Sequence, residues 1–136
     1  MKTAITKVEG APKPVGAYSP AVVYNGVIYC AGQIGIDSET GQLVSGGVEA
    51  QARRVMDNLK AVLSACSALP SDILMTSIFL VNIADAKVVN EIYSQFVCGN
   101  GDSVNSQNFP ARQTVAVKEL PLGALVEISL IAASKE

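Results

Sequence analysis

The sequence predicts an α+β fold in which two helices cover one face of a mixed β-sheet. Three observations point to it: a strong hairpin signal at Asn25-Gly26, two amphipathic segments with helical spacing, and short strand-like runs around them. The predicted order is hairpin, helix, strand, helix, strand, strand, which typically builds two layers around one core. With 136 residues, the chain can bury one good core but not two, so we expect a single domain over residues 1–136.

The first half of the chain predicts a hairpin, a loop and a long helix. After an irregular opening rich in Pro and Gly, the β-rich runs 21–24 and 27–31 flank Asn25-Gly26, the strongest short hairpin signal. Residues 35–47 carry turn chemistry and predict a surface loop. From Val48 to Ala68, apolar residues recur at helical spacing with charged residues on other faces, which predicts an amphipathic helix.

A buried strand and a second helix follow. Pro70-Ser71-Asp72 ends the first helix, and the apolar run 73–83 predicts an interior strand covered on both faces. The second helix begins near Asp85, a suitable N-cap, and ends before Gly99.

The chain closes with a polar loop over 99–108 and two predicted strands, 113–117 and 125–132, joined across Pro121-Leu122-Gly123. In the last strand, alternate side chains point to opposite faces, so an apolar set faces the helices while Glu127 faces away from them. Two helices cannot cover both faces of the sheet. We therefore expect the second face to pack on copies of the chain, with Glu127 in a cleft between subunits.

Composition excludes several classes of function. Hydrophobic residues make up 49% of the chain, charged residues 16%, and the mean hydropathy of +0.34 is high for a small monomer, which favours self-association. The net charge of −2 offers no electrostatic footprint for nucleic acid. Histidine is absent, which removes an imidazole base and histidine metal sites. Three separated cysteines and the lack of a signal peptide or membrane-spanning run favour free thiols in a cytoplasmic protein.

Two residues near the C-terminus form the candidate site. Arg112 stands at the head of one predicted strand, and Glu127 lies among apolar residues in the next. A lone acid in that setting is costly to bury without a partner, and arginine offers a planar fork that fits a carboxylate. Taken alone, each residue is more often part of a structural ion pair, so the pattern by itself leaves both interpretations open.

Several short motifs occur together and span nearly the whole chain. They are Gly16-Ala17-Tyr18-Ser19, Ala31-Gly32-Gln33-Ile34, Gln51-Ala52-Arg53 with Asp57-Asn58-Leu59, Val89-Asn90 with Tyr93, Phe109-Pro110-Ala111-Arg112, and Val126-Glu127-Ile128. In this order they resemble the RidA/YjgF/YER057c family, also known as endoribonuclease L-PSP. The resemblance implies a chorismate-mutase-like fold, a homotrimer with clefts between subunits, and no metal or organic cofactor. It also implies hydrolysis of reactive 2-imino acids, 2-iminopropanoate and 2-iminobutanoate, to 2-keto acids and ammonia.

The resemblance also assigns roles to individual residues. Arg112 would hold the carboxylate of the imino acid by two parallel hydrogen bonds. Glu127 would orient the attacking water and relay a proton to nitrogen, and Tyr18 would help to order that water. The other substrate-binding residues that it implies are Gly32, Asn90 and Thr114.

The sequence also departs from the family pattern. Gln113 and Thr114 stand where a small residue and a cysteine are common, Ser129 replaces a frequent second acid, and the loop 99–108 is longer than usual. We expect these differences to change substrate preference more than activity. Two other functions stay open: an endoribonuclease or translation inhibitor, and a non-enzymatic trimer that binds small molecules or acts as a chaperone.

Overall fold

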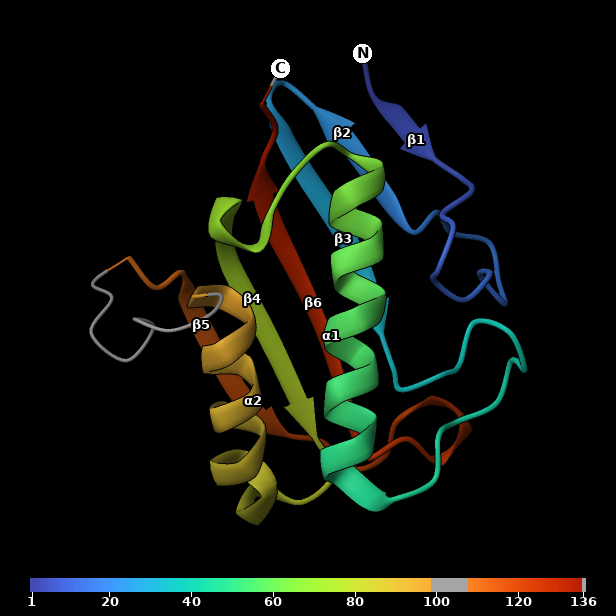
Figure 1. The fold of residues 1–136 in the computed structure, drawn as a ribbon, viewed down its shortest axis with the longest axis vertical. Coiled ribbons are helices and arrows are strands. Elements are labelled where there is room, and N and C mark those ends of the chain that lie inside the picture. The colour runs from blue at the N-terminus through green and yellow to red at the C-terminus, as the bar shows by residue number, and fades with distance from the viewer. Residues whose placement is uncertain (99–107, 136) are drawn as a thin grey trace.

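A six-stranded mixed sheet and two α-helices form two layers in the computed structural model, which describes residues 1–98 and 108–135 (Figure 1). The strands are β1 (Thr3–Ile5), β2 (Ala21–Tyr24), β3 (Val27–Gln33), β4 (Ile73–Leu80), β5 (Ala111–Ala116) and β6 (Val126–Ala133). Their order across the sheet is β1-β2-β3-β6-β4-β5. Both helices, α1 (Gly47–Ala65) and α2 (Ala86–Cys98), cover the same face, which confirms the predicted α+β class.

Asn25 and Gly26 form the predicted hairpin turn between β2 and β3. Their φ angles of 50° and 77° are both left-handed, as a two-residue type I′ turn requires. Strand β3 runs two residues beyond the predicted end at Ala31, since it also pairs with β6. The edge strand β1 was not predicted from the sequence, because its three residues are too few to show a hydrophobic period.

Helix α1 has the predicted apolar stripe but ends earlier than predicted. Its innermost side chains, among them Val55, Leu59 and Val62, are fully buried against the sheet. The helix ends at Ala65 because Ser67 turns into the left-handed region with a φ of 59°. The Ser67 and Ala68 N–H groups donate to carbonyls of the last turn, which is the Schellman arrangement.

Helix α2 connects the one parallel pair of strands, β4 and β5. Strand β4 ends at Leu80 rather than at Ile83, since Ile83–Asp85 forms a 3₁₀ turn before the helix. Asn82 caps this turn, because its Oδ1 accepts a hydrogen bond from the Ala84 N–H. Helix α2 begins at Ala86, directly after the predicted start near Asp85, and a side-chain cap by Asp85 stays a prediction. The predicted loop 99–108 lies outside the described residues except for Asn108.

The two faces of the sheet differ in how well they are covered. On the helix side, Ile78, Leu80, Val126, Ile128 and Leu130 are buried in the core. On the far side, alternate residues of β4 and β6 are only half-buried, so the described chain covers the predicted interior strand β4 on one face and not on both. Within the described part of the chain, no helix is long and apolar enough to span a membrane.

Candidate functional site

Arg112 and Glu127 project from opposite faces of the sheet in a single protomer. Arg112 is the Cα partner of Thr76 in the parallel β4–β5 pair, and Thr76 is buried on the helix side. Glu127 alternates with the buried Val126 and Ile128, so its side chain leaves the other face. One chain therefore does not bring the two predicted site residues together.

The Arg112 side chain lies over helix α2. Its Nη1 donates a hydrogen bond of 2.5 Å to Oδ1 of Asn90, and its Cζ lies 5.1 Å from the centre of the Tyr93 ring. Asn90 and Tyr93 are three residues apart on the helix and so share one face. Arg112, Asn90 and Tyr93 line a cavity of about 370 Å³, whose other lining residues are Ser94, Phe109 and Pro110. The arrangement holds a cation at a hollow large enough for a small anion.

Thr114 and Gln113, two of the residues that depart from the family pattern, lie on opposite sides of the edge strand β5. Thr114 is the Cα partner of Ile78 and lies on the helix side, half-buried, without being among the residues that line the Arg112 cavity. Gln113 donates a hydrogen bond of 3.0 Å from Nε2 to Oγ of Ser77 on the uncovered face. A contact between Thr114 and substrate thus stays a prediction.

Glu127 shares a second pocket with Tyr18 and Gly32. This pocket has a volume of about 330 Å³, and most of its other lining residues are apolar. Gly32 allows a close approach, since a Cβ placed on it would lie 2.5 Å from Oε2 of Glu127. The Tyr18 hydroxyl accepts a weak hydrogen bond from the Val15 N–H at 3.4 Å, which closes a turn between two residues that line the pocket.

Glu127 is the acid whose protonation the pocket changes. It is half-buried, and burial raises the pKa of its carboxyl because the charged form loses hydration. Among the described residues, no hydrogen-bond donor or cation contacts this carboxyl. An acid in this state can take a proton from water and return it, which suits a general acid–base role.

Two buried polar residues of α1 hold the walls of the Glu127 pocket. Nδ2 of Asn58 donates hydrogen bonds of 3.1 Å to the carbonyls of Ile34 and Ile36, both of which line the pocket. Oε1 of Gln51 accepts a 2.8 Å hydrogen bond from the N–H of Leu125, two residues before Glu127. No role was predicted for Asn58 and Gln51 from the sequence. Their polar side chains on the buried stripe of an amphipathic helix could have indicated one, because buried polar groups need hydrogen-bond partners.

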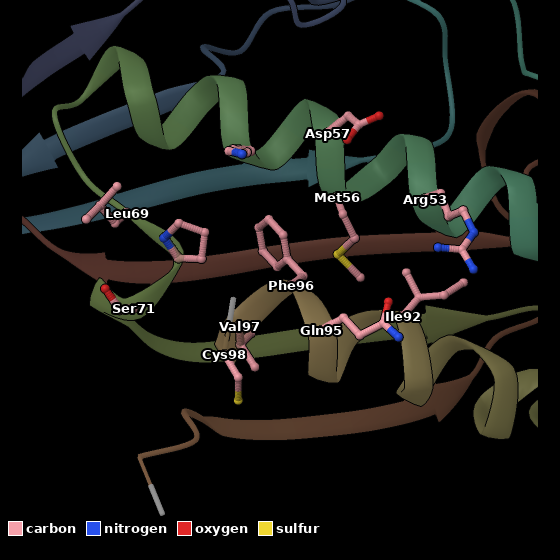
Figure 2. A pocket seen from close by; sticks show the side chains of 12 residues that line it. Arg53, Met56, Asp57, Leu69, Ser71, Ile92, Gln95, Phe96, Val97 and Cys98 are labelled. Carbon is pink, nitrogen blue, oxygen red and sulfur yellow. The ribbon is translucent and has the colours of Figure 1, made fainter. Parts of the chain in front are cut away.

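A larger hollow lies between α1, α2 and the turn before β4, and it contains none of the predicted site residues (Figure 2). Met56, Ile92 and Phe96 lie at its apolar centre, and Arg53 and Asp57 lie on the α1 side. Within the described ranges, no group of three acidic or cysteine side chains is arranged to hold a metal ion.

Comparison with known proteins shows extensive similarity along the chain. Residues 8–134 match the family model described as Endoribonuclease L-PSP. A human 2-iminobutanoate/2-iminopropanoate deaminase is 39% identical over 122 residues, which cover 90% of this chain and 83% of that protein. A Rid-family protein of unknown function from Yersinia pestis is 41% identical with a TM-score of 0.87, covering 98% of this chain and 99% of its own. TdcF of E. coli with bound serine is 29% identical with a TM-score of 0.86, covering 98% and 100%.

Proposed function

The chain belongs to the endoribonuclease L-PSP family, to which the Rid proteins also belong, and from this premise we propose that it is an imine deaminase. Its substrates would be 2-imino acids such as 2-iminopropanoate and 2-iminobutanoate. The human relative carries this activity in its name, and TdcF of E. coli holds serine, an amino acid of similar size and charge. The products would be the 2-keto acid and ammonia.

The observation that carries this proposal is the oriented guanidinium of Arg112 at the mouth of a cavity. Asn90 and Tyr93 fix the side chain, and a guanidinium carries four N–H groups besides the one bonded to Asn90, in a planar fork that suits a carboxylate. Binding the carboxylate would fix the position of the neighbouring C=N carbon. A protonated imine is already electrophilic, so the protein needs to supply little beyond position and proton transfer.

Glu127 would supply the proton transfer. Its carboxylate accepts a proton from water as the water oxygen bonds to the C=N carbon, and it then delivers that proton to nitrogen. The C–N bond then breaks and its electron pair leaves on nitrogen as ammonia. The Glu127 carboxylate, free again, takes the proton of the carbinolamine hydroxyl as the carbonyl of the 2-keto acid forms. The raised pKa of Glu127 supports this role because the group can hold the proton between the two steps.

We also propose that the working protein is a homotrimer in which the two half-sites meet between copies. Arg112 and Glu127 leave opposite faces of one protomer, so a shared site needs Arg112 of one copy beside Glu127 of another. The uncovered apolar face of the sheet supports this assembly.

The experiment that tests the activity couples a threonine dehydratase to the protein and follows 2-oxobutanoate with semicarbazide as a competing trap. We expect the wild type to speed 2-oxobutanoate release and to reduce semicarbazone. Arg112→Ala should lose both turnover and binding of 2-oxobutanoate, whereas Glu127→Ala should lose turnover and keep most of the binding. Arg53→Ala is the matched control, because that exposed arginine pairs with Glu49 on α1 and lines neither the Arg112 cavity nor the Glu127 pocket. Equal rates for wild type and Arg112→Ala would rule the proposal out.

Cleavage of RNA is the second candidate, and the description of the family model favours it. The chain has a net charge of −2 and no histidine, so it offers little to bind phosphates or to activate a ribose hydroxyl. Incubation with single-stranded RNA, comparing wild type with Glu127→Ala, separates this activity from a contaminating nuclease.

A further inference from the structure

Tyr93 belongs to a motif that the proposed chemistry does not use, yet it lies directly against Arg112. Its side chain is 3% exposed, and the guanidinium of Arg112 sits over its ring. We infer that Tyr93 is a positioning residue: its ring face holds the Arg112 guanidinium in the plane from which it binds a carboxylate. The inference rests on the proposed function, because it explains how the carboxylate-binding group is prepared.

The Arg112 side chain has considerable conformational freedom of its own. This residue lies on the exposed edge strand β5 and carries a long side chain that loses much rotamer freedom when it is fixed. The hydrogen bond to Asn90 fixes one nitrogen but leaves the guanidinium free to rotate about that contact. A flat aromatic face beneath the cation removes this rotation and attracts the cation electrostatically.

The Tyr93 ring is itself held in place by the sheet. The Tyr93 hydroxyl donates a hydrogen bond of 3.1 Å to Oγ1 of Thr76, a residue that is 1% exposed. Thr76 is also the Cα partner of Arg112 in the sheet. Tyr93 is thereby fixed to β4 by its hydroxyl while its ring supports a side chain from β5, so helix and sheet together set the position of the guanidinium.

The hydroxyl groups of Tyr93 and Thr76 are not needed to fill this part of the core. Two buried hydroxyl groups gain little stability over an apolar pair of the same shape, since each must first lose its hydration. A phenylalanine and a valine would fill the same space. The hydroxyl pair does what an apolar pair cannot, because a hydrogen bond fixes the depth and direction of the ring under Arg112.

The test compares variants that remove different parts of Tyr93. Tyr93→Leu removes the ring, and we expect the KM for the imine and the Kd for 2-oxobutanoate to rise roughly five- to thirtyfold while kcat changes less than about twofold. Tyr93→Phe keeps the ring but removes the hydrogen bond that fixes it, so it should lower the Tm and raise KM by a smaller factor, about two- to threefold. Val97→Ala, another buried change on α2, is the matched control and should lower the Tm without changing KM.

Wild-type protein supplies a second measurement that does not depend on a variant folding. The ring current of Tyr93 should shift the Arg112 Nε–H resonance upfield of those of Arg53 and Arg54, with Arg112→Lys providing the assignment. A wild-type spectrum without this shift would overturn the inference. So would an unchanged KM and Kd in Tyr93→Leu, provided that Arg112→Ala loses binding. If Arg112→Ala itself binds and turns over normally, the proposed function fails instead.

Discussion

Glu127 is half-buried with no partner among the described residues, so its charge affects stability as well as chemistry. Burial raises the pKa of the folded carboxyl above its unfolded value. The folded state then binds more protons, and the stability that the protonated group contributes is lost as the pH rises through the folded pKa. Glutamine is neutral at every pH, so we expect Glu127→Gln to have a higher Tm than wild type at pH 7. The difference in Tm should narrow at about pH 4, where the wild-type carboxyl is protonated as well. Paired thermal melts over this range measure it, and a lower Tm for Glu127→Gln at pH 7 would contradict the expected sign.

Gly32 provides a way to move the Glu127 carboxyl without removing it. A Cβ at residue 32 would lie 2.5 Å from Oε2 of Glu127, which is the far end of a flexible side chain. We expect Gly32→Ala to displace the carboxyl and lower kcat by tenfold or more, on the order expected for a 1 Å misplacement, while binding of 2-oxobutanoate changes little. Steady-state kinetics and calorimetric titration measure the two effects.

The control for Gly32→Ala is a glycine that contacts backbone instead. A Cβ on Gly35 would lie 2.8 Å from Cα of Gln51, so Gly35→Ala should lower the Tm. Gly32→Ala should keep the wild-type Tm, and in a Glu127→Ala background it should leave the remaining binding of 2-oxobutanoate unchanged. A loss of that binding in the Glu127→Ala background would show that Gly32 acts through another group.

Residue chemistry at the site was partly readable from the sequence. Arg112 and Glu127 stood out because a charged residue in a strand needs a reason to be there. The supporting residues were not assigned because their partners are distant along the chain: Tyr93 bonds Thr76 across 17 positions and Gln51 bonds Leu125 across 74. Only the fold brings such partners together.

At the scale of elements, the end of α1 carries avoidable strain. Ser67 occupies the left-handed C′ position of a Schellman motif, where glycine is the preferred residue. We expect Ser67→Gly to raise the free energy of unfolding by about 0.5–1 kcal/mol, since glycine adopts this conformation without a Cβ penalty. Urea denaturation measures the change. Ser64→Gly, inside the same helix, is the control and should instead lower the free energy of unfolding by a similar amount. A lower free energy of unfolding for Ser67→Gly would contradict the strain assigned to the left-handed backbone of Ser67.

The elements themselves were predicted more reliably than their ends. The hairpin, both helices and β4, β5 and β6 follow from periodicity and turn residues, which are local properties. The ends of β4 and α1 were wrong by three residues, because Asn82 and Ser67 stop these elements through a side-chain cap and a left-handed turn. Strand β1 forms by backbone hydrogen bonding to β2, a pairing that the sequence of residues 3–5 does not indicate.

The whole molecule is shaped by the face of the sheet that its helices leave uncovered. That face carries apolar residues that are half-buried or exposed, including Tyr29, Met75, Phe79, Val115 and Ile131. Such a face is typically covered by another protein chain. The sequence predicted that both helices lie on one face of the sheet and that the other face is left without helices. The register of the strand pairs β4–β5 and β4–β6 shows in addition that the side chains of Arg112 and Glu127 lie on opposite faces of the sheet. They therefore cannot meet within one protomer.

Mixing two inactive variants tests whether a site forms between copies. Arg112→Ala and Glu127→Ala should each be inactive alone, but in a randomly mixed cyclic trimer about a quarter of the interfaces would combine an intact Arg112 with an intact Glu127 from the next copy. We expect the exchanged mixture to recover about a quarter of the wild-type rate of 2-oxobutanoate release.

The control for this mixture replaces Glu127→Ala with the double variant Arg112→Ala/Glu127→Ala, which cannot restore any pair and should stay inactive. Native mass spectrometry establishes that the subunits have exchanged and that the assembly is a trimer. If mixed trimers form without recovering activity, then Arg112 and Glu127 of different copies do not share a site. The two half-sites would then have to act separately, and a single protomer, with a carboxylate-binding cation on one face and the acid on the other, has no way to bring both to one small substrate.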